Sequence, residues 1–160
     1  MIWVVYASKH GATEGIARHI AERLRASGRE VELRPADAAD DLGPPEAVVL
    51  GSAVYAGSWM KEAVEFAERR AGSLTGTPVW LFSSGPLGED VEDEEPQPRQ
   101  LPKLEEALSP REHRVFFGAL DRSKLGFAER MIMKAVKAPD GDYRDWDAIG
   151  AWADEIAAAL

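Results

Sequence analysis

The first part of the chain combines a short apolar segment, a loop rich in hydroxyl groups and a helical pattern. The apolar segment, typical of a buried strand, is Ile2-Trp3-Val4-Val5-Tyr6, and apolar residues then recur at helical spacing from Ile16 to Leu24. Between the two lies the loop Ser8-Lys9-His10-Gly11-Ala12-Thr13. A helix N-terminus presents backbone N–H groups and the positive end of the helix dipole. This segment therefore predicts an anion site, with a phosphate monoester as its natural ligand.

Apolar or β-branched segments alternate with helical patterns along the rest of the chain. We expect strands at 2–6, 31–33, 47–51, 78–83 and 114–118, and helices at 13–27, 60–70, 103–108 and 146–160. Continuous apolar strands such as Val79-Trp80-Leu81-Phe82 are typical of parallel sheets that helices cover on both faces. The sequence predicts one α/β domain over 1–160, with a doubly wound five-stranded parallel sheet and helices on both faces.

Three of the expected loops lie at one edge of this sheet. In doubly wound sheets, ligands bind beyond the carboxyl ends of the strands, where the strand order reverses. The loop after the first strand is the one described above. The loops after the third and fourth strands are Ser52-Ala53-Val54-Tyr55-Ala56-Gly57-Ser58-Trp59 and Ser83-Ser84-Gly85-Pro86-Leu87-Gly88. Ordinary turns also favour Ser and Gly. Three such loops together, with two aromatic residues, predict a ligand that has a phosphate and a flat ring.

Composition and motifs exclude several classes of protein. The chain has no cysteine, which excludes disulfides, thiolate metal sites and cysteine phosphatases. Its net charge of −9 argues against nucleic-acid binding. The first loop has a single glycine where a Rossmann fingerprint needs three, and no Walker motif is present. No apolar run is long enough to span a membrane and no cleavable signal precedes the first strand, so we expect a cytoplasmic protein.

The first loop resembles the phosphate motif of the flavodoxin family, [ST]-x-[TS]-G-x-[TS], except at His10. Segments 4–13, 51–59, 118–120 and 131–134, with Asp145-Trp146, further resemble the flavodoxin-type, menaquinone-dependent protoporphyrinogen oxidases. The resemblance implies FMN as cofactor and an electron-transfer oxidoreductase. No residue is assigned as catalytic, because the flavin carries the chemistry. A plain electron carrier and a flavodoxin-fold binding module without FMN are the alternatives.

The resemblance also implies roles for the residues of the first loop. Ser8, His10, Gly11, Ala12 and Thr13 would hold the FMN phosphate through hydroxyls and backbone N–H groups. Lys9 would neutralise phosphate charge, or remain a solvated side chain at the loop tip. An exposed histidine beside the phosphate is the alternative for His10.

The other two loops would hold the flavin ring. The loop at 52–59 would border the isoalloxazine, with Gly57 near N5 because a glycine peptide can reorient there. Trp59 or Tyr55 would stack on the ring, and the alternative for Trp59 is packing in the core. The loop at 83–88 would form the other wall, with its backbone facing the pyrimidine edge. We expect the remaining tryptophans to pack in the core: Trp3, Trp80, Trp146 and Trp152.

Two charged segments interrupt the pattern. Residues 86–102 form an acidic, proline-rich insertion with a net charge of −5, in which Arg99 alone opposes Glu89, Asp90, Glu92, Asp93, Glu94 and Glu95. It is either a solvated, extended loop or a lid or docking surface beside the flavin. Residues 123–137 are basic and amphipathic. They predict either a helix packed on the sheet or peripheral contact with the inner face of an anionic membrane. The redox partner stays open, with a quinone as one candidate.

Overall fold

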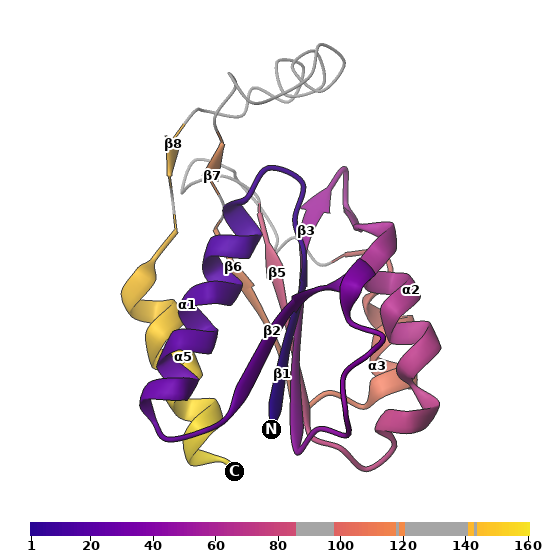
Figure 1. The fold of residues 1–160 in the computed structure, drawn as a ribbon. Coiled ribbons are helices and arrows are strands. Elements are labelled where there is room, and N and C mark those ends of the chain that lie inside the picture. Colours follow the sequence, from indigo (N-terminus) through magenta and orange to yellow (C-terminus); the bar gives the residue numbers. More distant parts are fainter. Residues whose placement is uncertain (86–97, 118, 121–140, 143) are drawn as a thin grey trace.

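A computed structural model of the chain describes residues 1–85, 98–117, 119–120, 141–142 and 144–160 (Figure 1). Several predictions therefore fall outside the described residues. These are Pro86, Leu87 and Gly88 in the third loop, the acidic run at 89–95 and the amphipathic segment at 123–137.

The core of the molecule is a parallel sheet with strand order β2-β1-β3-β5-β6. Its strands are β1 (Ile2–Ala7), β2 (Val31–Pro35), β3 (Ala47–Tyr55), β5 (Val79–Ser84) and β6 (Glu112–Phe116). A sixth strand, β4 (Ser58–Trp59), pairs antiparallel with the end of β3. A separate antiparallel pair joins β7 (Ala119–Leu120) and β8 (Gly141–Asp142). The chain runs outward from β1 to β2 and then crosses to β3 on the other side of β1, so the strand order reverses between β1 and β3.

Helices cover both faces of the sheet (Figure 1). Helices α1 (Ala12–Ala26) and α5 (Trp146–Ala158) pack on one face, and α2 (Lys61–Arg70) and α3 (Leu101–Leu108) pack on the other. Two short 3₁₀ segments, η1 (Ala36–Ala38) and η2 (Gly72–Leu74), follow β2 and α2. The predicted fold class, an α/β sheet with helices on both faces, is confirmed.

The alternating direction of side chains along each strand explains why helices must cover both faces of the sheet. Ile2 and Val4 of β1 belong to the core under α1 and α5, whereas Trp3 and Val5 belong to the core under α2 and α3. Successive side chains of a strand point to opposite faces, so a continuous apolar strand supplies two cores at once. All six residues of β5 are buried for this reason.

The clearest difference from the expected elements is the extent of β3. The sequence predicts that the third strand ends at residue 51 and that a loop follows, but β3 continues to Tyr55 and forms a hairpin with β4. The hairpin turn contains Ala56 and Gly57, with φ angles of 48° and 79°. Two successive residues with positive φ give the two-residue turn that matches strand twist. The other predicted boundaries in the described regions lie within about two residues of those observed.

The expected burial of the tryptophans is right for three residues and wrong for one. Trp3, Trp80 and Trp152 are 0%, 5% and 1% exposed. Trp146 is 38% exposed, because it opens α5 at the rim of the helix layer. The Arg144 guanidinium lies over its ring, 4.6 Å from the centroid, and the centroid of the His19 ring lies 5.3 Å from that of Trp146.

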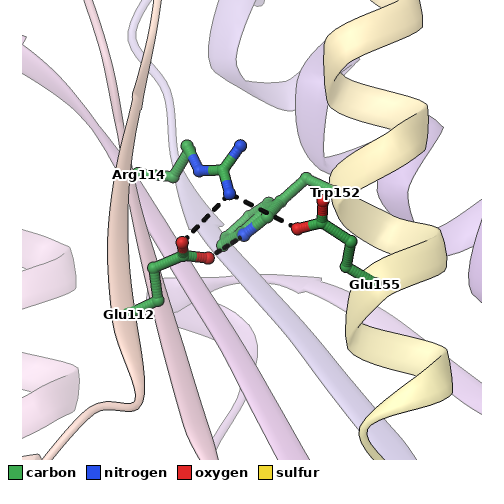
Figure 2. Close-up of polar contacts among 4 residues, drawn as sticks. All are labelled: Glu112, Arg114, Trp152 and Glu155. Carbon is green, nitrogen blue, oxygen red and sulfur yellow. Dashed lines mark hydrogen bonds and ion pairs between the residues drawn. The ribbon is translucent and has the colours of Figure 1, made fainter.

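A polar cluster ties the edge strand β6 to α5 (Figure 2). The indole Nε1 of Trp152 donates to Glu112 Oε1, and Arg114 Nη2 donates to Glu112 Oε2 at 3.0 Å. Arg114 also pairs with Glu155 of α5 at 3.4 Å. Partial burial of Glu112 acts to raise the pKa of its carboxyl. The hydrogen bonds from Trp152 and Arg114, together with the Arg114 charge, outweigh that effect and hold the pKa below its ordinary value.

We expect Glu112→Gln to destabilise the fold at neutral pH and to have a smaller effect in acid. A carboxyl with a depressed folded pKa stabilises the protein above its unfolded pKa, and that stabilisation is lost as the pH falls through the folded pKa. Because the pair is partly exposed, the effect at about pH 7 should not exceed about 1 kcal/mol. Urea unfolding at about pH 7 and about pH 3 measures the difference in the free energy of unfolding between the wild type and the variant.

Glu106→Gln, an exposed position of α3, is the matched control and should behave like the wild type at both pH values. A stability difference between wild type and Glu112→Gln that stays constant across this range would contradict the assignment.

Candidate functional site

The pairing register brings the three predicted loops to one edge of the sheet. Ala7, at the end of β1, is the register partner of Ser52 in β3. Ser52 is in turn the partner of Ser83 near the end of β5. The segments that leave these strands therefore start side by side at the carboxyl edge, next to the point where the strand order reverses. This is the place where doubly wound sheets bind ligands.

The first loop presents an open helix N-terminus. Gly11 is the N-cap of α1 in the left-handed conformation, with φ 89°, and no side chain caps the helix. The Gly11 N–H donates to Ser8 Oγ at 3.0 Å, which closes the loop on itself. Among the described residues, a Cβ built on Gly11 would meet nothing within 4 Å, so a small group has room beside this residue. The Thr13 side chain is 1% exposed, which makes Ser8 the more accessible hydroxyl of the two.

Tyr55 links the first loop to the β3–β4 hairpin. Lys9 Nζ lies 5.4 Å from the centroid of the Tyr55 ring, and the His10 ring lies 6.2 Å from it. His10 is half-buried, so the structure does not support the alternative of an exposed histidine. Lys9 is exposed but lies over an aromatic face rather than extending freely from the loop tip.

The structure supports the core-packing alternative for Trp59. Its side chain is 3% exposed and belongs to the core under α2 and α3. The indole Nε1 donates to Ser83 Oγ at 2.8 Å, and the Trp59 backbone N–H donates to Gln100 Oε1 at 3.0 Å. The next N–H, of Met60, donates to Ser52 Oγ at 2.9 Å. Trp59 therefore anchors the hairpin from inside, and Tyr55, which is half-buried, is the ring left at the surface.

The third loop contributes backbone rather than serine hydroxyls. Ser83 and Ser84 are 0% and 4% exposed. Ser83 Oγ lies 2.7 Å from His113 Nε2 while it accepts from Trp59. The Ser83 hydroxyl therefore links the Trp59 indole of β4 to the His113 ring of β6. Gly85 follows with φ 110°, and its N–H donates to the Phe116 carbonyl of β6 at 3.0 Å.

Comparison with known proteins identifies the family. A family model of the flavodoxin domain matches residues 3–147. The chain belongs to the flavodoxin domain family. A search of curated protein sequences finds no match to it.

Solved structures share the fold of this flavodoxin domain at low sequence identity. Oxidised flavodoxin 2 from Bacillus cereus is 21% identical, with a TM-score of 0.67 and 99% of each chain covered. A flavodoxin from the domain Archaea is 15% identical, with a TM-score of 0.64, 99% of this chain covered and 96% of that one. Rubredoxin oxygen:oxidoreductase from Desulfovibrio gigas is 17% identical, with a TM-score of 0.62. It covers 99% of this chain, which spans only 35% of its length.

Three residues at the site of this flavodoxin domain belong to none of the predicted loops: Arg99, Gln100 and Phe117. Arg99 and Gln100 bind the hairpin from the start of α3. Phe117 is 42% exposed and directly follows β6 at the same edge. The sequence distinguishes Arg99 in one way, because it is the sole cation of the acidic segment 86–102. No such signal distinguishes Gln100 and Phe117.

A cavity of about 190 Å³ lies on the β2 side of the first loop. Its lining is Tyr6, Ala7, Ser8, Pro35, Ala36, Asp37, Met60 and Glu62. Burial, followed by the neighbouring Glu14 carboxylate, raises the pKa of the Tyr6 phenol, which donates to Glu14 Oε1 at 3.2 Å. The carboxylates of Asp37 and Glu62 make this cavity unfavourable for an anion. Within the described residues, no helix is long and apolar enough to cross a membrane, and no acidic or histidine cluster fits a metal ion.

Proposed function

We propose that this flavodoxin domain binds FMN and transfers electrons through it. The observation that carries the proposal is the N-terminus of α1, which no side chain caps and where the described residues leave room around Gly11, beside Tyr55 of the β3–β4 hairpin. FMN has a phosphate at one end and a flat ring at the other. When bound, it supplies the redox chemistry, and the protein supplies position and electrostatics.

The first loop fits the phosphate end of FMN. The left-handed Gly11 turns the chain so that the first N–H groups of α1 face outward. Together with the helix dipole, these groups stabilise an anion without any basic side chain. Ser8 Oγ, which accepts from the Gly11 N–H, stands at the mouth of the same loop and adds a hydroxyl. Lys9 adds a positive charge at the loop tip.

The hairpin and the third loop fit the ring end. Tyr55 offers an aromatic face of the kind that stacks on a flavin. The turn at Ala56 and Gly57 presents backbone rather than bulky side chains to the ring edge. Gly85 brings a second stretch of backbone to the ring, and its left-handed φ of 110° favours glycine at this position.

Gly11→Val should weaken FMN binding by about 10- to 100-fold, because a branched side chain occupies the space in front of N–H groups that bind a charged phosphate. Gly28→Val is a matched control at the other end of the same helix, since Gly28 also has a left-handed φ, 93°, and open space around its Cβ position. It should lower stability without changing FMN affinity. Fluorescence titration of each apo-protein with FMN measures the affinity of both variants.

Riboflavin, which lacks the phosphate, should bind the wild type at least tenfold more weakly than FMN and should be much less sensitive to Gly11→Val. Equal wild-type affinities for FMN and riboflavin would refute phosphate binding at the first loop. So would equal losses of FMN affinity in Gly11→Val and Gly28→Val.

We further propose an activity like that of the menaquinone-dependent protoporphyrinogen oxidases. This proposal rests on the sequence segments that resemble those enzymes. One feature favours the plain electron carrier instead. Six carboxylates between residues 89 and 95 follow the third loop in sequence. A porphyrinogen substrate carries carboxylates of its own, and like charges slow its approach to the site.

Neutralising four of these residues, through Glu92→Gln, Asp93→Asn, Glu94→Gln and Glu95→Gln, distinguishes the two roles. For an oxidase, we expect porphyrinogen oxidation by the FMN-loaded variant to rise about two- to tenfold at low ionic strength, with a smaller rise at high salt. Reduction of a small neutral quinone is the internal control and should not change. If the loaded wild type oxidises no porphyrinogen at either ionic strength, the oxidase proposal is wrong and the carrier takes its place.

A further inference from the structure

Arg99 contacts both residues of the hairpin turn. Its backbone N–H donates to the Gly57 carbonyl at 2.9 Å. Its guanidinium Nη2 donates to the Ala56 carbonyl at 3.0 Å. The guanidinium also lies against Gly57 itself, where a built Cβ would be 3.7 Å from Arg99 Nε. One residue therefore binds two consecutive carbonyls of the turn that is expected to border the flavin ring.

The start of α3 makes Arg99 a firm point of attachment. Pro98, before it, is buried, and Leu101, after it, is 4% exposed in the core. The Leu101 N–H donates to the Pro98 carbonyl at 3.0 Å, which closes a turn around Arg99 and Gln100. Gln100 accepts from the Trp59 N–H on the same hairpin. Two adjacent residues thus hold the hairpin at its tip and at its base.

Among the described residues, Arg99 binds both carbonyls of the hairpin turn. Strand β4 is only two residues long, and short isolated hairpins are marginally stable in water. Ala56 has a φ of 48°, a left-handed conformation that costs free energy for a residue with a Cβ. Such a conformation persists when surrounding contacts fix it. Trp59 fixes the base of the hairpin, whereas Arg99 binds the turn directly.

We propose that Arg99 is a positioning residue that holds the Ala56–Gly57 turn in the conformation that receives the flavin ring. The proposal deepens the proposed function and rests on it. Arg99 acts through the turn and need not touch the cofactor. Preorganisation of this kind strengthens binding because the ordering of the turn is complete before the ligand arrives.

The first experiment uses the apo-protein and needs no cofactor. Amide hydrogen exchange is compared in wild type, Arg99→Ala and Arg69→Ala. Arg69, in the last turn of α2, is the matched control. Its exposed guanidinium pairs with Asp40. We expect exchange at residues 55–59 to be about tenfold faster in Arg99→Ala, as loss of a hydrogen bond predicts, and unchanged in Arg69→Ala. Unchanged exchange in Arg99→Ala would overturn the proposal.

The second experiment titrates the same proteins with FMN and with riboflavin. Arg99→Ala should weaken both ligands by the same factor, about tenfold, because the turn serves the ring that they share. Arg99→Lys should recover part of the loss, since it restores one donor. A loss for FMN alone would overturn the proposal by making Arg99 a partner of the phosphate, and so would unchanged affinity for both ligands. If the wild type binds neither flavin, the proposed function fails, and the exchange experiment alone decides whether Arg99 holds the turn.

Discussion

The whole architecture depends on burying a parallel sheet on both faces. Parallel strands need crossover connections, and the helices of those crossovers cover the two faces. Alternate residues of β1 therefore enter two separate cores, with Trp3 in one and Val4 in the other. The same connectivity sends every chain segment that leaves a carboxyl end to one edge of the sheet. The candidate site is a consequence of this arrangement, because the pairing of the strands brings its three loops together.

A buried hydrogen-bond network fixes the position of the β3–β4 hairpin at this edge of the sheet. Ser52 and Ser83 are polar residues inside apolar strands, and both are fully buried. Their hydroxyls bind the Met60 N–H and the Trp59 indole of the hairpin. Burying a polar group without a partner is costly, so each serine restricts where the hairpin can lie. The hairpin in turn presents Tyr55 beside the open N-terminus of α1.

The fold was predictable from the sequence, whereas part of the site was not. Apolar runs and helical spacing are local patterns, and they located the strands and helices to within about two residues in most cases. The inward direction of Trp59 and the exposure of Trp146 depend on strand register and on the rim of a helix layer, which no local pattern encodes. The burial of Ser83, where the sequence predicts the start of the third loop, depends on strand register in the same way. Arg99 meets the hairpin only after the chain folds, across 42 residues of sequence from Gly57.

The most direct test of the central claim is a crystal structure of the protein grown with FMN. We expect the phosphate against the backbone N–H groups at the start of α1, within hydrogen-bond distance of Ser8 Oγ. We expect the ring between Tyr55 and the segment that begins at Gly85, with Trp59 still packed in the core. An FMN phosphate in the acidic cavity beside Asp37, or in solvent away from Gly11, would contradict this placement.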